Sequence, residues 1–167
     1  YVCAVGYNHE KLEEKERKKT NELVKAFKEN TKTLANYKFD LQTTINKIVR
    51  LIDKGHPCIS SGANNYTMHA GHYFSVGGHE NLRFNLLIIF GQSDAENTWK
   101  SGNQTMYRQG LIKTFGIDLM NEIDDLQVRY HYLGLRKSDI IEANFVARRI
   151  VKELEEENKY YTTKERI

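Results

Sequence analysis

The residues most able to carry chemistry are gathered in one central stretch, from Pro57 to Asn103. It holds the only proline, one of the two cysteines and three of the six histidines. The segments on either side are rich in charge and are typical of amphipathic helices. Loops held by rigid elements can aim side chains at a substrate. We therefore expect the functional site in this stretch.

Two of these histidines, His69 and His72, stand three residues apart in the run His-Ala-Gly-His-Tyr. Imidazole is a general base near neutral pH and a common metal ligand. Residues three apart on a strand point to opposite faces, so both rings can meet one ion only if the chain bends at Gly71. A purely structural role for both rings is the alternative.

Cys58 begins the outline of a zinc knuckle, but Ser61 stands where the second cysteine would be. A structural zinc ion needs four ligands, usually thiolates or imidazoles. A second knuckle would fall in the segment Ser93-Asp-Ala-Glu96, which supplies no cysteine or histidine. We therefore expect no structural zinc, and we expect Cys58 to be a small buried structural residue.

The elements that must position these residues are mostly helices. Residues 9–37 alternate in charge at helical spacing, which predicts a solvated helix, with a phosphate-contacting basic face as the alternative. Asp40 is expected to cap a second helix, which ends at Gly55 and Pro57. The apolar residues of this second helix are Leu41, Ile45, Ile48, Val49 and Ile52.

Two runs in the centre have β character, over residues 66–73 and 82–90. Three helices are predicted after them, over residues 104–115, 118–128 and 138–158. The apolar side of the first includes Met106, Leu111, Ile112 and Phe115, and that of the last includes Ile141, Phe145, Ile150, Val151 and Leu154. The sequence therefore predicts an α+β fold in which helices surround a small β-containing centre.

Length and composition narrow the class of protein. A chain of 167 residues with 40% apolar and 28% charged residues is ordinary for a soluble globular domain. No apolar run approaches the roughly 18 residues that a membrane span needs, and the start does not resemble a signal peptide. We therefore expect an intracellular protein with no membrane partner. A net charge of +3 permits a nucleic-acid partner but does not demand one.

Five motifs occur in a fixed order within residues 48–126. They are Pro57-Cys58-Ile59-Ser60-x-Gly62, His69-Ala70-Gly71-His72-Tyr73-x-Ser75-Val76-Gly77, Leu82-Arg83-Phe84-Asn85, Ser101-Gly102-Asn103 and Tyr107-Arg108-x-Gly110-Leu111-Ile112. In order and spacing, these motifs resemble the NinG (Rap) family of phage recombination endonucleases.

The resemblance implies a small ββα-metal finger of the His-Me (HNH-like) type, embedded among long α-helices. It divides the chain into an N-terminal helical arm (1–55), a nuclease core (56–116) and C-terminal helices (117–167). The implied activity is metal-dependent, structure-selective cleavage of branched DNA recombination intermediates. One divalent ion, Mg²⁺ or Mn²⁺, would be the cofactor.

Site residues follow from the same resemblance. His72 is expected to be the general base, and Asn97 and His69 are expected to bind the metal. Expected phosphate contacts are Arg83, Lys100 and Arg108, because cationic side chains suit phosphate. Each of these three is explained equally well as the partner of a surface carboxylate.

The chain also departs from the family pattern. Ile88 and Phe90 occupy positions where the family often carries Asn-x-His, and neither side chain can orient a base or bind a metal. Catalysis then depends on other residues or is lost, so a catalytically degenerate DNA-binding module is the alternative. A third interpretation is a helical interaction protein whose central insert is structural.

The expected partner is branched or otherwise distorted DNA, recognised through its phosphate backbone rather than by base readout. A homodimer through the long terminal helices is a reasonable arrangement, although a solvated monomeric helix would have the same sequence pattern. The resemblance places the protein in the cytoplasm of a bacterial host, as the product of a phage or prophage.

Overall fold

The computed structural model describes the backbone of residues 4–130 and 134–166 and the side chains from Glu10 onward. The chain forms two compact units, Tyr1–Asn36 and Tyr37–Ile167. The second helix therefore belongs mostly to the larger unit. The functional boundary expected at residue 55 stays a prediction.

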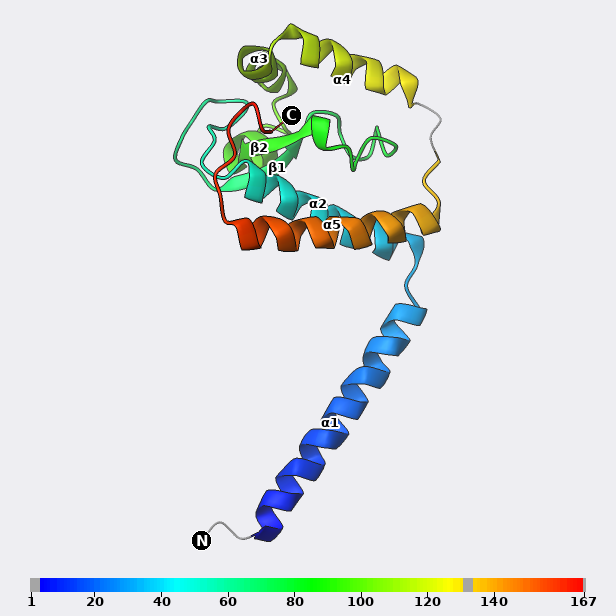
Figure 1. Ribbon diagram of the computed structural model, residues 1–167. Helices are drawn as coiled ribbons and strands as arrows, with labels where there is room; N and C mark the ends of the chain where they lie inside the picture. Colours follow the sequence, from blue (N-terminus) through cyan, green and yellow to red (C-terminus); the bar gives the residue numbers. More distant parts are fainter. Residues whose placement is uncertain (1–3, 131–133, 167) are drawn as a thin grey trace. The chain divides into compact units, whose positions relative to one another are not determined.

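The first unit consists mainly of α1 (Ala4–Asn30), a helix rich in charge (Figure 1). Its described side chains are exposed, and Glu14 and Lys18 form an ion pair of 2.7 Å one turn apart. The prediction of one helix over residues 9–37 is wrong, because α1 ends at Asn30. Asn36 Oδ1 accepts a hydrogen bond from the Thr33 N–H (2.9 Å), and Thr33 Oγ1 accepts one from the Asn36 N–H (3.3 Å). This reciprocal cap starts a new helix.

The new helix, α2 (Leu34–Ile52), begins six residues before the predicted cap at Asp40. Its apolar side is confirmed, since the buried residues of α2 are Leu41, Ile45, Ile48 and Val49. These side chains join apolar residues of the central strands and the later helices in one hydrophobic core.

A two-stranded antiparallel hairpin forms the β centre. The strands are β1 (Met68–His72) and β2 (Ile89–Ser93), paired in register from Met68↔Ser93 to His72↔Ile89. The second strand was expected over residues 82–90, and this is wrong. Leu86–Ile88 form a 3₁₀ turn, because the Asn85 side chain accepts a hydrogen bond from the Leu87 N–H (2.9 Å) and caps the turn. All five residues of β2 are buried.

A short π-helical turn, η2 (Ala95–Trp99), follows the hairpin and leads to α3 (Gln104–Phe115). The prediction of α3 is confirmed, although Met106, expected in the core, is exposed. Tyr107 is fully buried instead. Its hydroxyl accepts a hydrogen bond from the Phe90 N–H and donates one to the Gly71 carbonyl, both at 2.8 Å. The third helix is thereby fixed to both strands.

Two further helices complete the larger unit, α4 (Ile117–Arg129) and α5 (Lys137–Glu157). Figure 1 shows α5 lying along α2, and Thr44 Oγ1 donates to Asn144 Oδ1 (3.2 Å) between the two helices. The predicted apolar side of α5 is confirmed in part: Val151 is buried and Ile150 and Leu154 pack against the core, but Phe145 is 72% exposed. The buried residues of α5 are Ile140, Asn144, Ala147 and Val151.

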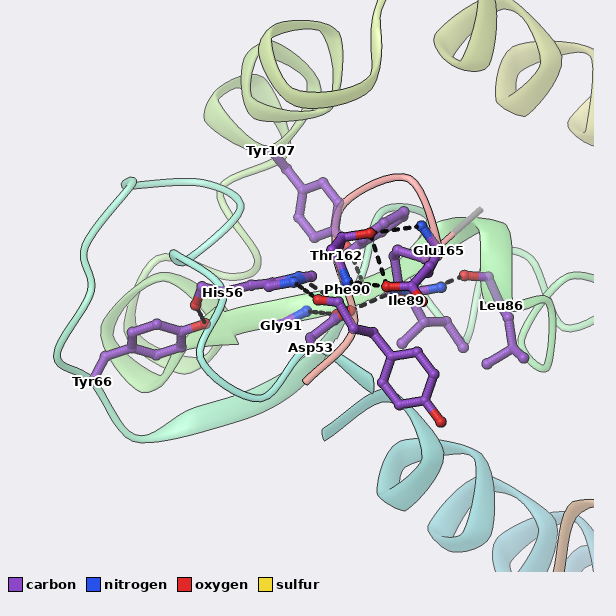
Figure 2. A network of polar contacts seen from close by, with 12 residues as sticks. Asp53, His56, Tyr66, Leu86, Ile89, Phe90, Gly91, Tyr107, Thr162 and Glu165 are labelled. Atoms are coloured by element: carbon purple, nitrogen blue, oxygen red, sulfur yellow. Dashed lines mark hydrogen bonds and ion pairs between the residues drawn. The ribbon is translucent and has the colours of Figure 1, made fainter. Parts of the chain in front are cut away.

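The C-terminal segment after α5 folds back beside β2. Arg166 Nε lies 2.5 Å from Asp53 Oδ1, and the Gly91 N–H donates to Asp53 Oδ2 (2.7 Å). Arg166 also donates to the Ile89 carbonyl (2.6 Å) and stacks on the ring of Phe90. This network is shown in Figure 2. Burial raises the pKa of Asp53, while Arg166 and the Gly91 amide oppose that shift.

The prediction of an α+β fold is confirmed, with long helices around a small hairpin. The hairpin is followed by a helical turn and α3. None of the described helices combines the length and the apolar character that crossing a membrane requires.

Candidate active site around the hairpin

His72 ends β1 and is half-buried. Its Nε2 atom lies 3.0 Å from the Arg83 carbonyl oxygen and 3.1 Å from Gln42 Nε2. One neutral tautomer donates Nε2–H to the carbonyl, and the other accepts a hydrogen bond from the Gln42 amide. The neutral ring is therefore held in place in either tautomer.

The surroundings of His72 favour this neutral form. Burial lowers the pKa of His72, with a smaller lowering contribution from the charge of Arg83. The carbonyl groups of Arg83 and Ala70 act in the opposite direction without reversing the shift. A neutral imidazole at physiological pH is the form that can accept a proton.

Gln42 is a site residue that the sequence analysis missed. Its Oε1 atom accepts a hydrogen bond from Arg83 Nε (3.2 Å), and its Nε2 atom donates to Asn46 Oδ1 (2.9 Å). These contacts fix the amide that faces His72, so α2 helps to position the imidazole. Thirty residues separate Gln42 from His72, and no local spacing connects them.

His69 lies on the opposite face of β1 from His72. The strand pairs regularly through Gly71, so the chain does not bend there. His69 Nε2 instead lies 3.6 Å from Asp94 Oδ1, with side chains 40% and 45% exposed. The sequence analysis also missed Asp94, whose only signal was its place just after a strand. The structure thus brings His69 to a carboxylate rather than to His72.

Asn97 is half-buried in η2, four residues beyond the end of β2. His72 pairs with Ile89, the first residue of β2, whereas Asn97 follows the last residue of that strand, so His72 and Asn97 lie toward opposite ends of β2. The length of β2 is about 13 Å at the usual strand rise. No hydrogen bond joins His72 to Asn97 in the described part of the chain. Within the same residues, no three His, Cys, Asp or Glu side chains are grouped to hold a metal.

The positions that correspond to two zinc knuckles lie side by side. The Ser93 N–H donates to the Sγ atom of Cys58 (3.2 Å), and the Glu96 N–H donates to Ser93 Oγ (3.3 Å). Burial raises the pKa of Cys58, but hydrogen bonds from Ser61 and Ser93 outweigh it and lower the pKa overall. The Glu96 carboxylate accepts hydrogen bonds from two neighbouring residues of its own segment, Lys100 and Asn103. One thiol and two hydroxyls do not suit structural zinc.

The three expected phosphate contacts differ in their surroundings. Arg108 makes a two-point ion pair with Asp124, at 2.9 and 2.8 Å, which raises the pKa of its guanidinium. The Arg83 side chain is largely covered. Lys100 is 59% exposed, although it pairs with Glu96 at 2.8 Å. Lys100 is therefore the most accessible of the three.

Ile88 and Phe90 are both buried in the hydrophobic core. The Phe90 ring lies 5.1 Å from the ring of Phe115 and has an edge contact with Tyr107. These two positions therefore hold the hairpin against α3, and they offer no polar group to a metal or to His72.

Comparison with known proteins finds one family, both with a family model and among individual relatives. The family model described as Bacteriophage Lambda NinG protein matches residues 3–157. Over 92 residues, the chain is 35% identical to Protein ninG of Enterobacteria phage H19B and to that of Escherichia phage lambda. Each match covers 54% of this chain, and 46% and 45% of the respective relatives. The chain thus spans about half the length of the curated relatives it matches. No solved structure matches it.

Proposed function

Because the chain belongs to the NinG family, we propose that it is a metal-dependent DNA endonuclease that cleaves branched recombination intermediates. The observation that carries the proposal is the setting of His72. Its ring is half-buried, its Nε2 atom lies 3.0 Å from a backbone carbonyl oxygen, and burial lowers its pKa, which favours the neutral form. This is the state that a general base needs before it accepts a proton. A His-Me finger is the fold that we propose for the hairpin, η2 and α3.

In this proposal, His72 takes a proton from the water that attacks the scissile phosphate. When Nε2–H donates to the Arg83 carbonyl, Nδ1 carries the lone pair and is the atom that accepts the proton. The resulting imidazolium is stabilised by the carbonyl groups of Arg83 and Ala70, which both favour the charged form. The Arg83 carbonyl thus takes over the orienting role that Ile88 cannot perform.

The donor set near His69 suits a loosely held Mg²⁺ or Mn²⁺. Asp94 supplies the carboxylate that such ions prefer, and His69 supplies an imidazole 3.6 Å away. Asn97 would add an amide oxygen from the same turn. Mg²⁺ usually keeps several waters and binds substrate phosphate, so few protein ligands are needed. Because this donor set lies on the face of β1 opposite His72, an ion held there would bind a DNA phosphate other than the one at which His72 acts.

Lys100 is the proposed primary phosphate contact, because its side chain is the most exposed of the three candidates. Arg83 and Arg108 would need to exchange their present partners before they could bind phosphate. Contacts of this kind recognise the shape of a junction and weaken as salt concentration rises.

We also propose that two copies associate through the long helices while acting in the host cytoplasm. In α1, the apolar side chains of Leu12, Leu23 and Phe27 are all exposed. Burying such side chains against a second copy would remove apolar surface from water.

A second candidate function is DNA binding without cleavage. It is favoured by the burial of Ile88 and Phe90 in the core. The same scaffold would then hold branched DNA for another enzyme.

One experiment separates these functions. The chain is incubated with four-way junction, fork, flap and linear duplex DNA, with Mg²⁺, with Mn²⁺ or with a chelator, and binding and nicking are measured in parallel. The nuclease proposal expects nicks in the branched substrates only, and only with a metal ion. Salt-sensitive binding without nicks under any metal would establish the binding module instead. No binding at low salt would leave neither function standing.

A further inference from the structure

Trp99 is the only tryptophan of the chain, and its side chain is 81% exposed. Tryptophan is highly buried on average in folded proteins, because its large apolar surface gains from leaving water. A tryptophan this exposed contributes little to the packing of its own domain. Its position therefore suggests a contact with another molecule.

Trp99 lies in a turn closed by backbone hydrogen bonds. The Lys100 N–H donates to the Ala95 carbonyl (3.2 Å), and the Gly102 N–H donates to the Glu96 carbonyl (3.0 Å). Three successive residues then adopt left-handed conformations, Ser101 (φ 51°), Gly102 (φ 85°) and Asn103 (φ 40°). Left-handed backbone is costly for residues other than glycine, and such strain concentrates at functional sites.

The indole itself is tethered beside the candidate metal ligands. Trp99 Nε1 donates to Asp94 Oδ2 (3.3 Å), and the other oxygen of Asp94 lies 3.6 Å from His69 Nε2. Lys100, the next residue, is 59% exposed and carries a positive charge. An aromatic ring is thus fixed next to a cation and a candidate metal site.

We propose that Trp99 is a stacking platform for an unpaired base of the branched DNA, an inference that rests on the proposed function. Aromatic side chains bind unpaired bases by stacking, whatever the base, because every base has a π-face. A cationic neighbour attracts the adjoining phosphate. Flaps and forks present unpaired bases, whereas an intact duplex does not. Trp99 would therefore distinguish DNA with unpaired bases at the branch from linear duplex.

The single tryptophan makes this contact directly measurable. The full chain, without added metal, is titrated with a labelled flap DNA that carries unpaired thymines at the branch. A second flap carries abasic sites at the same positions, so that phosphates remain and bases are removed. Anisotropy of the label reports binding, while tryptophan emission reports the surroundings of Trp99. We expect the thymine flap to quench the emission strongly and the abasic flap to leave it nearly unchanged.

Variants extend the test. Trp99→Ala should weaken binding of the thymine flap about 5- to 150-fold, the effect of losing one stacked base. It should barely affect the abasic flap, and Trp99→Phe should restore most of the affinity. Val128→Ala is the matched control, because Val128 is equally exposed at 81% on α4. Circular dichroism checks that each variant is folded.

The outcomes keep the two proposals apart. Binding without a change in emission, or a Trp99→Ala variant that binds like Val128→Ala, would overturn stacking and leave the proposed function intact. Equal losses on both flaps would show that Trp99 contacts the backbone rather than a base, and would also overturn the inference. Absence of all DNA binding at low salt would remove the proposed function itself and stacking with it.

Discussion

Two polar pairs flank the same hairpin, and they are built in opposite ways. The first, Asp53 and Arg166, is 3% exposed on both sides and joined at 2.5 Å. The second, His69 and Asp94, is about half exposed and its partners lie 3.6 Å apart. Asp53 and Arg166 are both buried and hydrogen-bonded within the protein, whereas the more exposed second pair can exchange its contacts for those of a ligand. This difference separates a part of the molecule that provides stability from one that we propose provides chemistry.

Breaking the buried pair should have the largest effect. Arg166→Ala leaves the Asp53 carboxylate buried without its cation, and we expect a loss of about 3–5 kcal/mol in the free energy of unfolding. Urea denaturation measures this loss. Arg129→Ala is the control, since Arg129 forms an exposed pair with Asp125 at 3.6 Å, for which we expect a change of at most about 1 kcal/mol. Similar losses of unfolding free energy in both variants would mean that the buried pair is no more stabilising than an exposed one.

A second test concerns Gly71, which stands between the two histidines. A Cβ atom at this position would lie 2.2 Å from Gln92 Oε1, inside the core. We expect Gly71→Ala to cost about 1–3 kcal/mol through overpacking, again measured by urea denaturation. Gly77→Ala, where a Cβ atom would meet nothing within 4 Å, is the control. An unchanged Gly71→Ala variant would mean that this glycine has no packing role.

The range of the contacts along the chain explains why the sequence predicted some elements and not others. The helix α3 was predicted with its correct ends, because the spacing of Leu111 and Phe115 and the stop at Gly116 are local signals. The contact between Asp53 and Arg166 joins residues 113 apart, so no local pattern announces it. The buried side of α5 was predicted only in part for a similar reason, since the buried Asn144 depends on Thr44 of a distant helix.

The candidate site, too, could be predicted only where its signals are local in the sequence. The motif from His69 to Tyr73 marked the hairpin, and the resemblance assigned roles to His72 and Asn97. Their surroundings, however, depend on residues that only the fold brings near. Gln42 comes from α2, and Asp94 faces His69 only because β1 and β2 pair in their observed register.

A smaller effect is expected from the titration of His72. Its pKa is lowered in the folded chain, so the unfolded chain binds more protons near and below the ordinary value of 6.5. The contribution of His72 to stability is therefore complete above pH 6.5 and is lost as the pH falls through the lowered pKa. Free energies of unfolding at pH 7.5 and 5.5 should differ less in His72→Gln than in the unchanged chain. An identical difference in the two proteins would mean that folding does not lower the pKa of His72.

The smallest effect is expected from metal removal. Binding of structural zinc contributes on the order of 10–16 kcal/mol in zinc-finger peptides, yet here Ser61, Ser93 and Glu96 form hydrogen bonds around Cys58 instead. We expect a chelator to leave the unfolding curve unchanged. A large loss of stability, restored by zinc, would show that the knuckle positions hold a metal after all.

The most direct test of the account compares cleavage of a four-way junction by the unchanged chain, His72→Ala and the control His79→Ala, with Mg²⁺ or Mn²⁺. Loss of a general base lowers a rate by about 10²- to 10⁴-fold. The account predicts a loss of this size in His72→Ala alone, with junction binding nearly unchanged and the variant still folded. Cleavage that persists in His72→Ala at the rate of the unchanged chain would contradict it.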